Sequence, residues 1–207
     1  MRPPAVILAG GLSSRMGSPK ALLELAGMRL IDRIVARLQP QCDRLLVNSN
    51  DPAIAVDGYK RIPDRFANFP GPLAGIHAAL SRLAETDGTA ATHMLSAPVD
   101  CPFLPDDLVA RLADGLEGPD SAAVAMSGGQ WQPVVALWPL SALPRLDTWL
   151  REPPSLKMRV FLETLEVNSV AFPMLDTVAG PLDPFFNINR PADLATALHH
   201  IAGEKNP

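Results

Sequence analysis

Residues 5–20 read AVILAGGLSSRMGSPK, and this stretch carries the strongest indication of fold in the chain. The run from Ala5 to Ala9 is short and apolar and stops at Gly10-Gly11, as a buried strand followed by a glycine turn does. Adjacent glycines let the backbone approach a nucleotide closely and turn amides toward phosphate oxygens. The stretch therefore predicts a first strand that delivers a phosphate-binding loop.

This loop differs from the two common phosphate-binding sequences. It lacks the Gly-Lys-Ser/Thr of a Walker A loop and the Gly-x-Gly-x-x-Gly of a dinucleotide fingerprint. An ordinary strand-to-helix loop with surface charges is the alternative interpretation. The full string favours a triphosphate site, in which Arg15 grips an oxyanion with its planar fork and Lys20 supplies a mobile point charge.

Apolar segments with strand and helix patterns alternate after this loop. Apolar positions from Leu22 to Leu38 recur at mostly helical spacing, with Arg29, Arg33 and Arg37 on another face. Strands are also expected over 45–47, 59–62, 93–99, 122–126, 133–137 and 169–172, and helices over 71–83, 106–114, 140–150, 156–165 and 192–201. This order predicts one three-layer α/β/α domain over residues 1–207, with a mostly parallel Rossmann-like sheet. Ligands of such sheets bind at the carboxyl ends of the strands.

The composition of the chain argues against several classes of function. The chain has 207 residues, 47% of them hydrophobic, and a net charge of -4, which argues against general binding to nucleic acid. Cys42 and Cys101 form no CxxC pair and fit a reduced compartment. No stretch approaches the length of a membrane span, and the first apolar run is too short for a signal peptide. We expect a cytoplasmic protein without nucleic-acid or membrane partners.

Asp100 is the second chemical feature. It stands where an apolar strand meets a proline turn, at the edge of the sheet where ligands bind. A carboxylate there can hold Mg²⁺, which bridges phosphate oxygens during phosphoryl transfer. A turn aspartate before Pro102 is the alternative. The glycine loop on a neighbouring strand makes Asp100 the best metal candidate.

Together these segments resemble the molybdenum-cofactor guanylyltransferases, which belong to the larger nucleotidyltransferase group. The most specific match is the LAGGxSxRMG…K string over residues 8–20, and the resemblance covers nearly the whole chain. Many relatives carry an aspartate before the loop lysine, where this chain has Pro19. The supporting matches are Val47-Asn48, Pro63-Asp64, PGPLAG over 70–75, Asp100-Cys101-Pro102 and FNINRP over 186–191 with its Asn-x-Asn signature.

The resemblance implies a nucleotidyltransferase fold and a set of site residues. The first half, 1–105, would bind the nucleotide and the second, 106–207, the acceptor. Arg15, Lys20 and Asp100 would be catalytic: the two cations would hold the phosphates, and Asp100 would carry Mg²⁺. The backbone of the glycine turn would face guanine, and Asp64 would bind either guanine or ribose. The residues implied to contact GTP are Leu8, Ala9, Gly10, Gly11, Lys20, Asn48, Asp64 and Asp100.

The sequence indicates the acceptor-binding residues less specifically than the nucleotide-binding residues. A helix start at 70–75 offers amides to an anion, or is simply a helix start with proline in its first turn. The basic residues near 158 could equally be a solvated helix face, and the asparagines near 188 could cap the last helix. Trp131 and Trp138 read as packing residues. The acceptor candidates are Gly71, Gly75, Lys157, Arg159, Asn187 and Asn189.

By this resemblance the expected reaction transfers GMP from GTP to the terminal phosphate of molybdopterin and releases pyrophosphate. A cytidylyltransferase acting on the same cofactor is the nearest alternative, and Gly10 in the loop favours guanine. A sugar-phosphate nucleotidyltransferase and a catalytically silent nucleotide-binding protein are the others. Transient molybdoenzyme or cofactor-chaperone partners are also expected.

Overall fold

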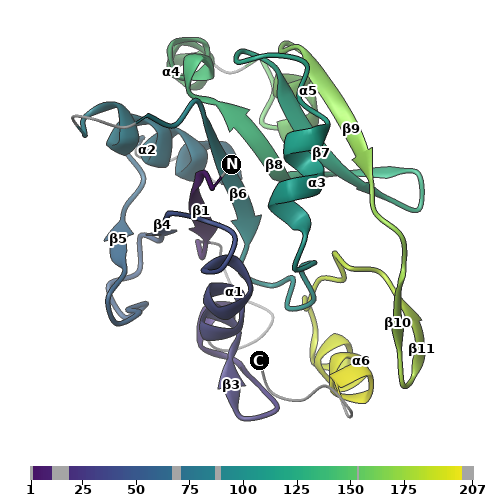
Figure 1. Cartoon of the computed structure of the whole chain (residues 1–207). Helices are drawn as coiled ribbons and strands as arrows, with labels where there is room; N and C mark the ends of the chain where they lie inside the picture. The colour runs from purple at the N-terminus through teal and green to yellow at the C-terminus, as the bar shows by residue number, and fades with distance from the viewer. Residues whose placement is uncertain (1, 11–18, 67–70, 87–89, 153, 202–207) are drawn as a thin grey trace.

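A seven-stranded sheet forms the centre of the molecule (Figure 1). The computed structural model describes residues 2–10, 19–66, 71–86, 90–152 and 154–201. The strands of the sheet are β1 (Pro4–Leu8), β4 (Arg44–Asn48), β5 (Lys60–Ile62), β6 (His93–Pro98), β7 (Ala122–Ser127), β8 (Gln130–Pro139) and β9 (Val167–Ala171). Their spatial order is β5-β4-β1-β6-β8-β7-β9.

The sheet is mostly parallel, as predicted. β5, β4, β1 and β6 pair in parallel, and so do β7 and β9. β8 is the exception, because it runs antiparallel to both β6 and β7. The carboxyl ends of β1, β4, β5, β6 and β7 consequently lie at one edge of the sheet, and β8 begins at that edge.

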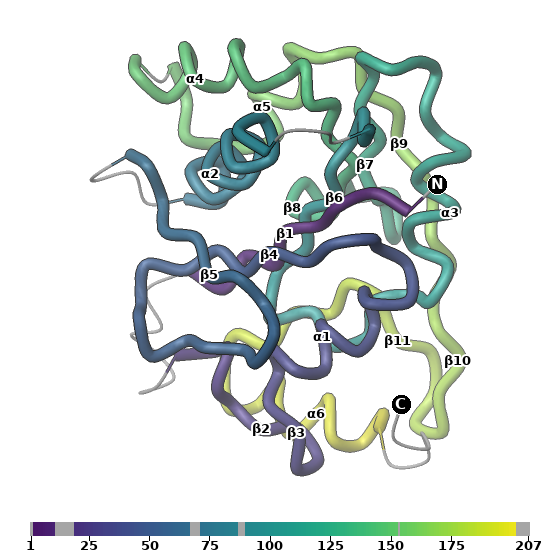
Figure 2. Tube along the Cα trace, turned by 60° about the vertical axis from the view of Figure 1, so that its left-hand side comes forward, coloured from purple at the N-terminus to yellow at the C-terminus, as the bar shows by residue number. Residues whose placement is uncertain are grey.

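Helices cover both faces of the sheet, which confirms the three-layer α/β prediction. Leu73, Leu146 and Phe161 belong to one apolar cluster with the even-numbered side chains of β1, Val6 and Leu8. A separate cluster forms on the other face. Figure 2 shows α2 and α4 on one side of β1 and β4 and α1 on the other. The covering helices are α2 (Pro72–Ala84), α4 (Leu143–Arg151) and α5 (Met158–Leu162) on the first face, and α1 (Leu30–Leu38) and α3 (Leu108–Asp114) on the second.

A third apolar cluster joins the last helix to a hairpin near the amino terminus. The helix α6 (Pro191–Ile201) contributes Ala197 and Ile201, and the hairpin of β2 (Glu24–Leu25) and β3 (Met28–Arg29) contributes Leu25. A second hairpin, β10 (Leu175–Thr177) and β11 (Gly180–Leu182), was not predicted and adds Leu182. This packing brings residues near the two ends of the chain together.

The predicted helix from Leu22 to Leu38 is wrong over Leu22 to Arg29, because α1 begins only at Leu30. Residues 20–22 form a single 3-10 turn, η1 (Lys20–Leu22), and the β2–β3 hairpin precedes α1. Ala26 and Gly27 both have positive φ, as a tight two-residue hairpin turn requires. The apolar spacing that mimicked a helix arises because Leu25 and Leu30 both enter the third cluster. Arg33 is also buried, and its Nη2 donates to the carbonyl of Leu25 at 3.0 Å.

The remaining predicted elements differ mainly in length. β8 runs from Gln130 to Pro139, and the predicted helix over 140–150 is divided into η2 (Leu140–Ala142) and α4. None of the described helices is long and apolar enough to cross a membrane.

Candidate active site

Lys20, Asp100 and Asn189 meet at the carboxyl edge of the sheet. Lys20 Nζ lies 2.8 Å from Asp100 Oδ2 and 2.5 Å from Asn189 Oδ1. The Lys20 and Asp100 side chains are only 23% and 17% exposed, so their pairing is shielded from water on most sides. The predicted lysine and carboxylate therefore converge on one point, although 80 residues separate them in sequence.

The segment that carries the two asparagines is fastened to the same strand end. The amide of Ile188 donates to the carbonyl of Asp100 at 2.9 Å, and Cys101 Sγ lies 3.1 Å from Asn187 Oδ1. The asparagine side chains do not cap α6. Asp193 accepts instead from the amides of Asn189 and Arg190, both at 2.8 Å.

Cys101 acts here as a buried hydrogen-bond donor. Burial, reinforced by the nearby charges of Asp100 and Asp183, raises the pKa of the Cys101 thiol well above its usual value. The protonated thiol donates to Asn187, so it helps to orient that amide. Only the position of the cysteine directly after Asp100 could have pointed to this role.

Asn48 and Asp64 form a second polar group at the same edge. Asn48 is buried, and its Nδ2 donates to Asp64 Oδ1 at 2.8 Å and to the carbonyl of Ile62 at 3.2 Å. Asn50, which was not among the predicted site residues, donates from Nδ2 to Asp64 Oδ2 and accepts from the Asp64 amide, both at 2.8 Å. Both carboxylate oxygens of Asp64 are therefore held in fixed positions.

Gly75 lets α2 approach the ends of β1 and β4. A Cβ on Gly75 would stand 2.2 Å from Asn48 Oδ1 and 2.7 Å from Leu8 Cδ2. Gly10 faces the same amide, since a Cβ there would stand 3.8 Å from Asn48 Oδ1. Gly75 is thus required for close packing against Asn48, a contact that no local sequence pattern indicates.

The end of β1 is built into the sheet. The Ala9 amide donates to the carbonyl of Asn48 at 2.9 Å, and the Leu8 carbonyl accepts from the Val99 amide at 3.1 Å. Gly10 follows and is exposed. Gly11 and Arg15 lie outside the described residues, so their predicted contacts stay predictions.

The other acceptor candidates lie at the starts of α2 and α5. Gly71 is exposed and directly precedes α2. Lys157 and Arg159 lie at the start of α5, which packs against β8. Arg159 pairs with Glu163 at 2.9 Å, and its guanidinium lies 4.9 Å from the centre of the Trp131 ring. Trp138 is a core residue, as predicted.

The oxygen atoms around Lys20 suit a small divalent cation. Asp100 Oδ2 and Asn189 Oδ1 already point at one positive charge, the Lys20 ammonium. Carboxylate and amide oxygens are ligands for Mg²⁺, which usually takes one or two carboxylates and completes its shell with water and substrate phosphates. Within the described residues no cluster of three or more His, Cys, Asp or Glu side chains forms a ready metal cage. Asp100 and Asn189 are therefore the candidate ligands for such an ion.

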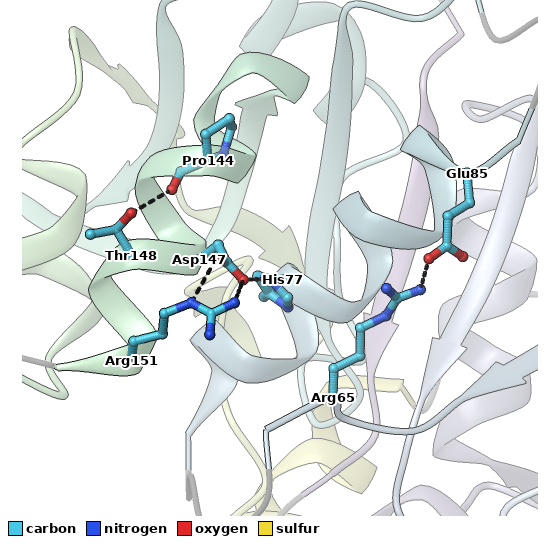
Figure 3. A network of polar contacts seen from close by, with 7 residues as sticks. All are labelled: Arg65, His77, Glu85, Pro144, Asp147, Thr148 and Arg151. Atoms are coloured by element: carbon cyan, nitrogen blue, oxygen red, sulfur yellow. Dashed lines mark hydrogen bonds and ion pairs between the residues drawn. The ribbon is translucent and has the colours of Figure 1, made fainter.

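A separate polar network lies between α2 and α4 (Figure 3). His77 Nε2 lies 3.3 Å from Asp147 Oδ1, and Arg151 Nε lies 2.9 Å from Asp147 Oδ2. These residues line a cavity of about 520 Å³ together with Arg65 and Phe66. Burial lowers the pKa of His77, which leaves the imidazole neutral near pH 7. Figure 1 places α4 at the opposite end of the molecule from β3 and α6, so this network is not part of the Lys20–Asp100 site.

A family model and curated relatives both match most of this chain. The model of the MobA-like NTP transferase domain matches residues 5–168. The molybdenum cofactor guanylyltransferase of Rhizobium meliloti (strain 1021) is 46% identical over 198 residues, covering 94% of this chain and 90% of that protein. The protein of the same name from Rhodopseudomonas palustris (strain BisB5) is also 46% identical over 198 residues, covering 94% and 91%.

Solved structures share the fold. The molybdopterin-guanine dinucleotide biosynthesis protein A from Archaeoglobus fulgidus has a TM-score of 0.72 at 24% identity and covers 95% of this chain and 97% of its own. A CMP:2-keto-3-deoxy-manno-octonic acid synthetase has a TM-score of 0.71 at 15% identity, covering 99% and 100%. At these identities the likeness supports the fold alone.

Proposed function

Because the chain belongs to the MobA-like NTP transferase family, we propose that it is a molybdenum cofactor guanylyltransferase. It would transfer GMP from GTP to the terminal phosphate of molybdopterin. The family and the names of its relatives set the reaction class, and the 2.8 Å approach of Lys20 to Asp100 carries the proposal for this chain. That approach provides a cation and a carboxylate at the predicted triphosphate site.

In the proposed reaction an oxygen of the acceptor phosphate attacks the α-phosphorus of GTP. The new P–O bond forms as the bond between the α-phosphorus and its bridging oxygen to the β-phosphate breaks, and pyrophosphate leaves. Such transfers need positioning and charge neutralisation more than covalent help from the protein. Lys20 would neutralise phosphate oxygens, and the fixed carboxylate of Asp64 would accept from the guanine N1–H and 2-amino groups or from the ribose.

Mg²⁺ is the proposed cofactor. Asp100 would hold it, with Asn189 as the nearest additional oxygen donor. When bound, the ion supplies charge neutralisation at the triphosphate. Lys20 would then pass from Asp100 to the substrate phosphates, because its ammonium and the metal compete for the same carboxylate.

Compartment and partners are also proposals. The two cysteines are free thiols, which suits the reducing cytoplasm. A dinucleotide cofactor must be delivered to the enzyme that uses it, so transient contacts with molybdoenzymes or a cofactor chaperone follow from the proposed product.

The test offers GTP, CTP, ATP and UTP separately with molybdopterin and measures pyrophosphate release, with Mg²⁺ and with chelator. We expect release with GTP and Mg²⁺, and near-complete loss in Asp100→Asn. Asp106→Asn is the matched control, because Asp106 is 82% exposed and pairs with Arg37 away from the site. Preference for CTP would indicate a cytidylyltransferase, and no release with any nucleotide would overturn the enzyme assignment. Full activity of Asp100→Asn would remove the metal assignment.

A further inference from the structure

Trp131 stands at the beginning of β8, on the face of the sheet that α2, α4 and α5 cover. It pairs with Met126 across to β7, and its half-buried indole packs against the apolar cluster of that face. An indole offers a large flat apolar face, and aromatic rings favour stacking on one another.

An irregularity in the pairing of β7 with β8 sets the direction of Trp131. Ala136 pairs with Val124, but the next pair is Gln132 with Ala125, so β8 contains three additional residues, 133–135, at this point. Because side chains alternate along a strand, an odd number of additional residues exchanges the two faces. Trp131 thereby joins the face of Ala136, and Gln132 turns the other way and donates to Ser127 Oγ at 3.0 Å.

Arg159 covers the indole from α5. Its guanidinium carbon lies 4.9 Å from the centre of the Trp131 ring, and Glu163 one helical turn later holds its Nε at 2.9 Å. The Arg159 side chain is nevertheless 58% exposed. A planar guanidinium held over an indole makes a platform that is both flat and positively charged, and Arg is well suited to stacking on conjugated rings.

This platform lies at the same edge of the sheet as Asp100. β6 and β7 both end at that edge, and β8 begins there. β8 pairs with β6 over Ala136 to Pro139, and Trp131 lies further along β8 toward the edge. Asn48 and Asp64 lie on the other side of Asp100, after β4 and β5. With the nucleotide candidates on one side of the metal candidate, the acceptor has to extend toward β8.

We propose that Trp131 and Arg159 form the subsite for the flat conjugated ring of the acceptor. The inference rests on the proposed function, in which that ring is the pterin of molybdopterin, and it adds Trp131 as a specificity residue. The pterin stacks against the Trp131–Arg159 pair, and its phosphate reaches toward Asp100. Glu163 is a positioning residue, because it fixes the guanidinium over the indole.

Steady-state transfer measurements on Trp131→Phe, Trp131→Leu and Arg159→Ala test this subsite. We expect Trp131→Leu and Arg159→Ala to raise the KM for molybdopterin about tenfold, or about 1.4 kcal/mol, and to leave the KM for GTP unchanged. Trp131→Phe keeps an aromatic face and should recover most of the affinity. Arg151→Ala is the matched control, because Arg151 is 67% exposed and bonds a carboxylate four residues away on α4.

An unchanged KM for molybdopterin in both Trp131→Leu and Arg159→Ala would overturn the inference. Equal losses for GTP and molybdopterin would also overturn it, because they would indicate a purely structural role. A direct titration with pterin-6-carboxylate, followed by the pterin's own fluorescence, separates this result from a failure of the proposed function. Loss of pterin binding in Trp131→Leu, in a protein whose parent binds pterin but transfers no nucleotide, would keep the subsite and refute the transferase assignment.

Discussion

Replacement of Gly75 by alanine tests the packing that fixes the nucleotide end of the site. A helix interior ordinarily gains about 1 kcal/mol from Gly→Ala. At Gly75 the added methyl would stand 2.2 Å from Asn48 Oδ1 and 2.7 Å from Leu8 Cδ2, so both neighbours have to move. The two effects have opposite signs, and their sizes decide the outcome.

The cost can be estimated from the contacts of Asn48. Displacing its amide breaks the hydrogen bonds to Asp64 and to the Ile62 carbonyl, at about 0.5–1.5 kcal/mol each. Crowding the buried Leu8 methyl adds about 1–3 kcal/mol. After the gain in helix propensity, we expect a net loss of about 3 kcal/mol and a Tm lower by about 6–12 °C. The KM for GTP should also rise, because Asp64 loses one of its two amide donors.

Urea and thermal unfolding, followed by circular dichroism, measure the stability change, and initial rates measure the KM for GTP. Gly118→Ala is the control, because a Cβ there has nothing within 4 Å. In an Asn48→Ala background the cost of Gly75→Ala should shrink, because only the contact with Leu8 remains. If Gly75→Ala proved as stable as the parent or more so, helix propensity would dominate and the close-packing argument would fail.

Three further predictions concern charge and protonation. Lys20→Ala should lower kcat about 10²–10³-fold with little change in Tm, whereas replacement of the exposed Lys60 by alanine should leave kcat unchanged. Equal rates for the two variants would show that Lys20 takes no part in the reaction. His77 is buried with a lowered pKa, so the folded state binds fewer protons than the unfolded state, and the free energy of unfolding should fall by up to about 1.4 kcal/mol per pH unit as pH drops below about 6.5. Urea unfolding between pH 7 and 5 should show this slope in the parent protein and a weaker slope in His77→Gln. The neighbouring charges do not change in this range, because Arg65 and Arg151 stay charged. The hydrogen bond from Arg151 lowers the pKa of Asp147, so Asp147 loses its charge only at more acidic pH. Burial raises the pKa of Cys42 to about 12 and raises that of Cys101 well above its usual value, so iodoacetamide at pH 8 should label both only after unfolding. Rapid labelling of the folded protein, seen by mass spectrometry, would contradict the buried thiols.

The sequence by itself determined the layers of the fold and the strand ends that carry polar groups. The apolar run before Gly10 and the apolar run before Asp100 both mark buried strands, and parallel strands place their carboxyl ends at one edge. That reasoning was enough to bring Lys20 and Asp100 to the same edge. It failed over Leu22 to Arg29, because the apolar spacing of a hairpin and of a helix can coincide over one or two turns.

Only the tertiary structure decided which distant residues share the site. Asn189 reaches Lys20 across 169 positions because α6 packs on the β2–β3 hairpin, and no local pattern encodes that contact. The need for glycine at position 75 depends on where Asn48 points, and the direction of Trp131 depends on three additional residues in the pairing of β8. Local periodicity records which face of an element is buried, whereas close approaches between elements depend on strand order and register, which form only when the whole sheet assembles.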